Sequence, residues 1–157
     1  MSSGNIKFNI EKIRKALYIS VTGRATFEIA YMLEKFCLPF LEKNYHLEFD
    51  FSKTTYLDST FLGIMALFTR KSIYPIMICN ATQNVFDYFK VLNIHTYFEF
   101  THKEFDLEWF ELPLINEENS ELIKTVIDAH EELIKKGSTD SNKFKSLVES
   151  LRKALIH

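Results

Sequence analysis

The stretch FDFSKTTYLDSTFLGIMALFTR, residues 49–70, begins with a β-like run and continues directly into an apolar helix. Before the junction, apolar and polar residues alternate over residues 47–51, which is the period-two pattern of a strand with one face covered. After it, most residues from Thr60 to Lys71 are apolar, which predicts a helix that packs against a sheet. Asp58, Ser59 and Thr60 stand at the junction, so the sequence places hydroxyl groups at a helix N-terminus.

Two interpretations of Asp58, Ser59 and Thr60 are open. Asp, Ser and Thr are common helix N-caps, so the three residues can simply begin an ordinary helix. The unpaired N–H groups and the dipole at a helix N-terminus also make such a serine receptive to a phosphate, which would act as a removable charge. Ser59 is then the expected acceptor, and Thr60, one residue along, is the alternative.

The hydrophobic pattern of the remaining chain predicts alternating strands and helices. We expect strands at residues 6–10, 16–22, 47–51, 76–79 and 97–100, and helices at residues 27–41, 60–71 and 82–92. The first two strands form a hairpin, and Pro39 interrupts the first helical face. Such alternation is typical of an α/β sandwich with a mixed, largely parallel sheet. Loop residues at the carboxyl ends of the strands, namely Gly23, Asp58-Ser59 and Asn80, are expected to converge on one edge.

Four segments in the same order resemble the STAS domains of bacterial anti-sigma factor antagonists. Asp58-Ser59-Thr60-Phe61-Leu62-Gly63 is similar to the phosphorylation loop of that family, which reads roughly D-S-S-G/A-L-G. The strand that ends in Gly23-Arg24 looks like the Gly-Arg turn before the family's first helix. A strand at residues 74–80 and a helix at residues 85–92 follow in the expected order. The resemblance extends over residues 5–104.

The resemblance implies a STAS-like sandwich and a set of site residues. It implies phosphorylation of Ser59, with Thr60 as the alternative. It also implies a partner-binding surface, made of Gly23, Arg24, Asp58, Ser59, Thr60, Phe61, Leu62 and Asn80. Two positions depart from the family, because Phe61 stands where Gly or Ala is usual and Thr26 stands where an Asp is common. Phe61 can pack beneath the loop or protrude as a partner contact.

The pattern changes after residue 104. We therefore divide the chain into a STAS domain at residues 5–104, an apolar linker at residues 105–116 that includes Trp109, Leu114 and Ile115, and a helical hairpin at residues 117–157. Amphipathic helices are predicted at residues 118–136 and 142–156. Residues 126–133 and 142–144 also resemble the C-terminal extension of some proteobacterial antagonists.

The apolar stripes of the hairpin are too short for three sustained heptads and too large to remain exposed, so we expect it to fold back on the domain. Two roles for it are open: it completes the core, or it serves partner binding or self-association.

Composition excludes several functions. The 157 residues carry a net charge of −2 with both signs interspersed, which gives no electrostatic footprint for nucleic acid or an anionic membrane. Hydrophobic residues make up 46% of the chain. They form no run of the ~20 residues that a membrane span needs, and residues 1–5 lack a signal-peptide core, so a cytoplasmic protein is expected. Cys37 and Cys79 lie in apolar patterns and predict buried thiols.

Catalytic and metal-binding patterns are absent from the sequence. The five histidines show no metal-ligand spacing, and no P-loop, G-x-G-x-x-G or G-x-S-x-G motif occurs. The sequence places no histidine beside Ser59. His130, on the apolar flank of a predicted helix, is expected to be a hydrogen-bonded interface residue. We therefore expect no enzyme, no cofactor and no metal.

By resemblance, the unphosphorylated protein binds an anti-sigma factor, often one with serine kinase activity, and thereby frees a sigma factor. Phosphorylation of Ser59 breaks that binding, and a PP2C-type phosphatase restores it. A monomer is expected. Two alternatives stay open: a STAS accessory subunit of a lipid transporter, which would need no reversibly phosphorylated serine, and a small-ligand-binding regulatory domain, against which the small number of glycines counts.

Overall fold

The computed structural model of the protein describes residues 4–113 and 118–156. Its elements follow in the order β1 (Asn5–Glu11), β2 (Ala16–Ala25), α1 (Phe27–Glu42), β3 (His46–Leu57), α2 (Ser59–Lys71), β4 (Met77–Cys79), α3 (Gln83–Val91), η1 (His95–Tyr97), β5 (Glu99–Thr101), β6 (Phe110–Glu111), α4 (Asn119–Lys135) and α5 (Ser141–Ile156). The α/β class predicted from the alternating pattern is confirmed, with a helical hairpin at the C-terminal end.

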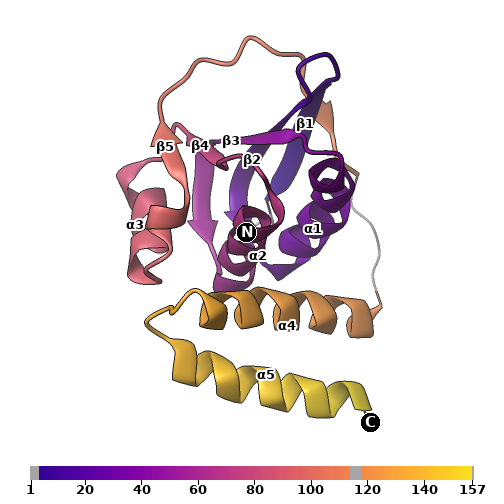
Figure 1. The fold of residues 1–157 in the computed structure, drawn as a ribbon, viewed down its shortest axis with the longest axis vertical. Coiled ribbons are helices and arrows are strands. Elements are labelled where there is room, and N and C mark those ends of the chain that lie inside the picture. Colours follow the sequence, from indigo (N-terminus) through magenta and orange to yellow (C-terminus); the bar gives the residue numbers. More distant parts are fainter. Residues whose placement is uncertain (1–3, 114–117, 157) are drawn as a thin grey trace.

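The six strands form one mixed sheet in the order β5-β4-β3-β2-β1-β6. Strands β2 to β5 are parallel to one another, and β1 is antiparallel to both β2 and β6. Each parallel connection steps in the same direction across the sheet through one helix. Because such crossovers share one handedness, α1, α2 and α3 lie on the same face of the sheet (Figure 1).

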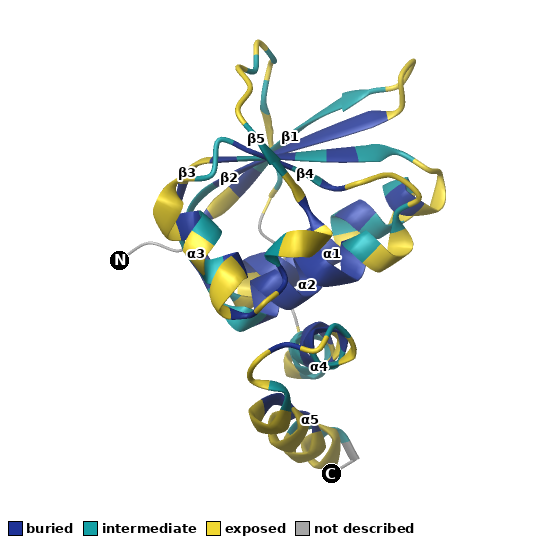
Figure 2. Cartoon of the chain, turned by 60° about the vertical axis from the view of Figure 1, so that its left-hand side comes forward, coloured by how far each residue is buried: buried dark blue, intermediate teal, exposed yellow. Residues whose placement is uncertain are grey.

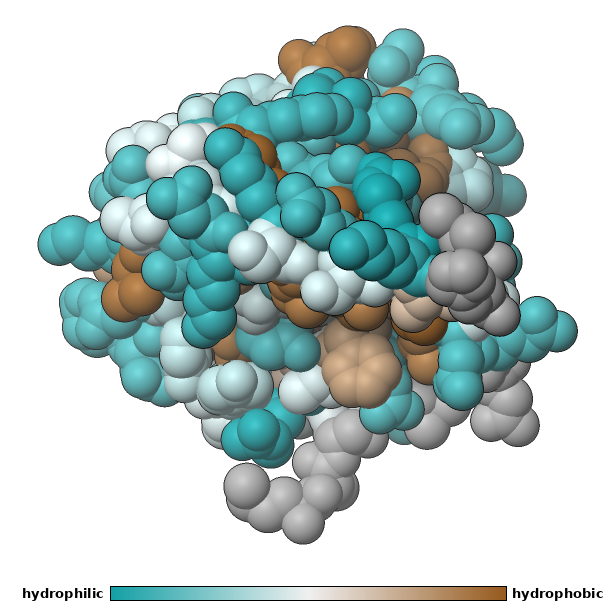
Figure 3. All heavy atoms as spheres, turned by 90° about the horizontal axis from the view of Figure 1, so that it is seen from below, coloured by the Kyte–Doolittle hydropathy of each residue, from teal (hydrophilic) through white to brown (hydrophobic). Residues whose placement is uncertain are grey.

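The two C-terminal helices add further layers beyond α1 and α2. α4 packs on the outside of these two helices, and α5 packs on the outer side of α4 (Figure 2). The exposed positions of α5 are mostly polar, and the molecule seen from that end presents a largely hydrophilic surface with small hydrophobic patches (Figure 3). α5 therefore closes the stack of layers toward solvent.

α2 lies at the centre of this stack. Nine consecutive residues of α2, Thr60 to Phe68, are buried, whereas a helix on a protein surface keeps a polar face. The rings of Phe61 and Phe68 face Phe51 and Phe49 of β3, at centroid distances of 6.2 and 6.4 Å. α4 covers the opposite side of α2. The helix is therefore apolar nearly all round because it has a partner on each side.

Pro39 does not end the first helix, because α1 continues through it to Glu42, and two boundaries near the site also differ from the sequence-based expectation. β3 continues to Leu57 instead of ending at Phe51, because its second half keeps pairing with β2 after β4 has ended. Within residues 52–57 only Thr54 and Leu57 are buried, so that half shows no apolar alternation. Gly23 and Arg24 lie inside β2 and not in a turn after it. A register shift at Gly23, where φ is +81°, lets the strand continue to Ala25.

Residues 102–113 connect opposite edges of the sheet. The segment leaves β5 and ends in β6, which pairs with β1. On the way, the Trp109 ring packs against Phe105, and Phe105 packs against Tyr18 of β2, both at 5.9 Å between ring centroids. Residues 114–117, which include Leu114 and Ile115 of the apolar linker, lie outside the described residues.

Two further observations concern the described residues. Cys37 and Cys79 are free thiols buried in the fold, as predicted. None of the described helices combines the length and the apolar character needed to cross a membrane.

We expect removal of residues 118–157 to destabilise the domain. The deletion would expose the outer side of α2, so the truncated protein should aggregate or melt about 10 °C or more below the full chain. Thermal unfolding and size-exclusion chromatography measure both effects. A truncated protein that remains monomeric and equally heat-stable would show that α2 does not need this cover.

Candidate functional site

Asp58 is the N-cap of α2. Its Oδ1 accepts a hydrogen bond from the Phe61 N–H at 2.8 Å, so the capping interpretation of this residue is confirmed. Burial raises the pKa of the Asp58 carboxyl, and hydrogen bonds from backbone N–H groups together with the charge of Arg24 oppose that rise. The Asp58 carboxyl therefore already occupies the N-terminus of α2.

Ser59 is the first residue of α2, and its hydroxyl meets a residue from the other end of the chain. Its Oγ lies 2.8 Å from Nε2 of His130 in α4. Nδ1 of His130 lies 2.7 Å from the Val126 carbonyl oxygen, which can only accept, so Nδ1 carries a proton. In the neutral imidazole Nε2 is then the acceptor, and Ser59 donates to it.

The environment of His130 favours this neutral form. The residue is 2% exposed, and burial lowers its pKa. Its ring also packs edge-on against Phe144 of α5, at 4.8 Å between centroids. The expectation that His130 is a hydrogen-bonded interface residue is confirmed. What the sequence did not reveal is that its partner is Ser59.

A serine that donates to a neutral histidine has the form of an activated nucleophile, but its surroundings differ from a catalytic site. Oxyanion stabilisation at a helix N-terminus requires free N–H groups. Here the N–H groups of Phe61 and Thr60 already bond the Asp58 carboxyl. The Ser59–His130 bond is therefore a contact between two helices.

Gly63 lies one turn after Ser59 and permits a close approach of α4. A Cβ placed on Gly63 would lie 2.3 Å from the carbonyl oxygen of Ala129 and 2.7 Å from its Cα. These are backbone atoms of α4, which cannot move aside without moving the helix. The absence of a side chain at residue 63 is thus a condition for the docked position of α4.

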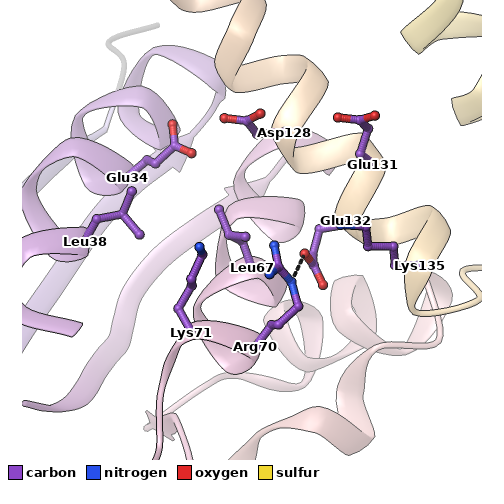
Figure 4. A pocket seen from close by; sticks show the side chains of 9 residues that line it. All are labelled: Glu34, Leu38, Leu67, Arg70, Lys71, Asp128, Glu131, Glu132 and Lys135. Carbon is purple, nitrogen blue, oxygen red and sulfur yellow. Dashed lines mark hydrogen bonds and ion pairs between the residues drawn. The ribbon is translucent and has the colours of Figure 1, made fainter. Parts of the chain in front are cut away.

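Arg70 extends the same contact toward the end of α2. Its Nε lies 2.9 Å from Oε1 of Glu132 in α4, and Glu132 is 2% exposed (Figure 4). Lys136 also pairs with Glu132, at 3.3 Å. Removal of one partner from a buried ion pair is costly, so Glu132 ties α4 to α2.

A second carboxyl group lies buried between α1 and α4. Glu34, 3% exposed, accepts a hydrogen bond from Thr125 Oγ1 at 3.1 Å. Its side chain and that of Asp128 point toward one another in Figure 4, beside a cavity of about 240 Å³ that Arg70 and Lys71 also line. Burial, followed by the charge of Asp128, raises the pKa of Glu34 to about 7.

Arg24 lies near the start of α2, since its charge acts on the Asp58 carboxyl, whereas Gly23 pairs with Thr54, four residues before Asp58. Arg24 pairs with Tyr56 in the sheet and places its guanidinium over the Tyr56 ring, 4.2 Å from the centroid. The Asp58 N–H donates to the Ala25 carbonyl at 3.1 Å. The end of β2 and the start of α2 therefore share one edge of the domain.

Asn80 does not join this edge. Its amide donates to the Lys103 carbonyl at 2.7 Å and to Asp50 at 3.2 Å. Asp50 precedes Asp58 by eight residues, a distance of roughly 20 Å or more in an extended strand. The expected convergence fails at Asn80 because β3 runs far past the end of β4. Asn80 instead fixes the segment that follows β5.

Three residues expected at the partner surface lie in the interior. Thr60, Phe61 and Leu62 are 5%, 0% and 2% exposed. Of the two possibilities for Phe61, the structure shows the buried one, because its ring packs beneath the loop against β3. Ser59, by comparison, is half-buried. The α2 residues that contact α4 at this site are Ser59, Gly63 and Arg70, of which the sequence analysis named only Ser59 as a site residue.

The fold has a counterpart among solved structures. It is similar to the anti-sigma factor antagonist SpoIIAA in its unphosphorylated form, with a TM-score of 0.51 over 63% of this chain and 90% of that chain. This chain has the STAS fold. The identity between the two sequences is 11%, so the likeness concerns the fold. No protein-family model matches the sequence, and a comparison with curated proteins gives no match.

More than a third of this chain has no counterpart in the matched part of SpoIIAA. Across residues 4–113 and 118–156, no group of three or more His, Cys, Asp or Glu side chains is arranged to hold a metal ion.

Glu34→Gln should remove a pH dependence of stability. Because the folded state raises the pKa of Glu34 from 4.5 to about 7, it binds more protons than the unfolded chain between these values. Stability should therefore fall as pH rises from 4.5 to 7 and the carboxylate forms near Asp128, while the charge of Lys35 and the hydrogen bond from Thr125 offset part of that cost. We expect the variant to gain on the order of 2 kcal/mol over the wild type at pH 8, and little at pH 5.

Urea unfolding at the two pH values measures the difference. Glu28→Gln, an exposed carboxylate at the start of the same helix, is the matched control and should gain nothing. An equal effect of Glu34→Gln at pH 5 and pH 8 would contradict the assignment of the proton to Glu34.

Proposed function

We propose that this protein is a binding switch of the anti-sigma factor antagonist type, with Ser59 as the residue that carries the phosphate. One observation supports the proposal above the others. The Ser59 hydroxyl stands at the N-terminus of α2, directly after a carboxylate that already caps the helix. A regulatory protein of the same fold, SpoIIAA, is known in a form described as unphosphorylated.

The physical effect of a phosphate at Ser59 follows from its neighbours. A phosphoserine carries about −1.5 to −2 charges at neutral pH. Asp58 already occupies the favourable position against the helix N–H groups, so the two anions compete. In a docked complex this repulsion adds to the cost of desolvating the phosphate. A loss of ~3 kcal/mol would weaken binding roughly a hundredfold.

In this proposal the unphosphorylated protein binds an anti-sigma factor or serine kinase in the cytoplasm, and a PP2C-type phosphatase regenerates it. Arg24 lies on the same edge as Ser59 and is available to a partner on its outer side. A lipid-transporter subunit or a small-ligand-binding domain with this fold would have no need of phosphate at Ser59. Phosphorylation therefore separates the proposal from both alternatives.

Phosphate should be found on Ser59 in protein isolated from growing cells or from stressed cells. The half-buried hydroxyl of Ser59 lies nearer the surface than Thr60, which is the alternative acceptor. Phosphopeptide mass spectrometry distinguishes the two, and Ser59→Ala is the control that should abolish the signal. Phosphate confined to residues other than 59 and 60 under both conditions would refute the assignment.

Ser59→Asp should lower affinity for the partner at least 10-fold relative to Ser59→Ala. The carboxylate adds a charge beside Asp58, whereas alanine removes only the hydroxyl. The two full-length variants, used as parallel baits, should retain different amounts of the same anti-sigma factor or kinase. Equal retention by both baits would show that charge at residue 59 does not control binding.

A further inference from the structure

The side of α2 that carries Ser59 is covered by the protein's own C-terminal hairpin. Ser59, Gly63 and Arg70 are spaced by four and seven residues, so they lie on one side of the helix, which we call the Ser59 face. Each of the three meets α4, through His130 at 2.8 Å, the Ala129 backbone and Glu132 at 2.9 Å respectively. α4 thus occupies the whole length of this face.

The contact leaves no room for another molecule between Gly63 and α4. Even one additional carbon on Gly63 would collide with the backbone of Ala129. A phosphate on Ser59 is larger than that carbon, and it would also face the unprotonated Nε2 of His130. A kinase, a phosphatase or a binding partner can therefore engage Ser59 only after α4 has moved away.

We propose that the α4–α5 hairpin is an intramolecular cover of the Ser59 face, which competes with the partner and with the kinase for the same surface. The regulatory meaning of this cover rests on the proposed function of Ser59. Only the undocked fraction of the protein is then open to phosphorylation or to a partner. The apparent affinity for the partner is the intrinsic affinity multiplied by this undocked fraction.

The way the hairpin is fastened suits a contact that opens and closes. Several of its contacts with the domain are polar: Arg70 with Glu132, Thr125 with Glu34, Thr139 with the Val91 carbonyl, and Tyr97 with the Lys136 carbonyl. Polar groups of this kind find water as an alternative partner when an interface opens. Most of the apolar core belongs to the sheet and α1 to α3, and the hairpin adds only Ala129, Leu133 and Phe144 to its fully packed part.

The cover also indicates what kind of partner fits the Ser59 face. α4 presents a small residue to Gly63, a hydrogen-bond acceptor to Ser59 and a carboxylate to Arg70. A partner that displaces α4 must satisfy the same three groups, because an unpaired Ser59 hydroxyl or Arg70 would weaken the complex. We therefore expect the partner to bind through a helix that bears these three features.

Access to residue 59 can be measured without knowing the partner. In the full-length Ser59→Cys protein, the new thiol would be the reactive one, because Cys37 and Cys79 are both 0% exposed. The rate of alkylation by iodoacetamide, with the modified peptide located by mass spectrometry, reports how often the cover opens. The same reagent applied to protein that retains Ser59 gives the background from the two native thiols.

Two substitutions open the cover from opposite sides of the same contact. Gly63→Ala acts on α2 and Ala129→Asp acts on α4, each combined with Ser59→Cys. Both should raise the alkylation rate of Cys at residue 59 at least 10-fold. Ser150→Ala, on the exposed side of α5, is the matched control and should change it less than 2-fold. Far-UV circular dichroism verifies that each variant remains folded.

The proposal is overturned if the Ser59→Cys protein alkylates as fast as it does in urea, since the thiol would then be uncovered already. It is equally overturned if neither Gly63→Ala nor Ala129→Asp raises the rate. Phosphate occupancy of Ser59 in cells, compared between wild type and Ala129→Asp, separates this proposal from the proposed function. Faster alkylation with no phosphate in either protein supports the cover and refutes the phosphorylated switch. Unchanged alkylation with phosphate on Ser59 refutes the cover and supports the phosphorylated switch.

Discussion

The close approach of α4 to Gly63 is the constraint on which the rest of the structure depends. With no side chain at residue 63, the Ala129 backbone can lie where a Cβ would be only 2.3 Å from its carbonyl oxygen. That proximity brings His130 within hydrogen-bond distance of Ser59 and Glu132 within reach of Arg70. The glycine therefore determines both the burial of α2 and the surroundings of the serine.

The interface between α4 and the domain combines the properties of a core and of a transient complex. Ala129 and Leu133 are fully buried and belong to the same apolar cluster as α2. Around them lie an ion pair with a buried carboxylate and a second carboxyl, Glu34, whose pKa is about 7. Contacts within one chain that are this polar resemble interfaces between domains, for which relative motion is expected.

Most of the fold was predictable because its longer elements have strong local signals, whereas η1 and the two-residue strand β6 had none. Period-two alternation located the strands, and an apolar run after Asp58 located α2. Local signals could not show that β3 continues past β4, because residues 52–57 show no apolar alternation and are held in the strand by pairing with β2. Nor could they show that Ser59 meets His130, since the two residues are 71 positions apart. The apolar stripes of the hairpin were the sequence feature that predicted its packing on the domain, but they could not show that α2 is the helix it covers.

The order of the elements along the chain matters for biosynthesis. The sheet and α1 to α3 all precede α4, and domains tend to fold as they are made. At about 5 to 20 residues per second, residues 118–156 take roughly 2 to 8 s to synthesise. Until these residues have been made and have docked, no part of the chain can cover Ser59 and the outer side of α2. A kinase or partner that acts on the growing chain meets no competition from α4. It can therefore modify or bind a molecule before the docking of α4 on α2 reaches equilibrium.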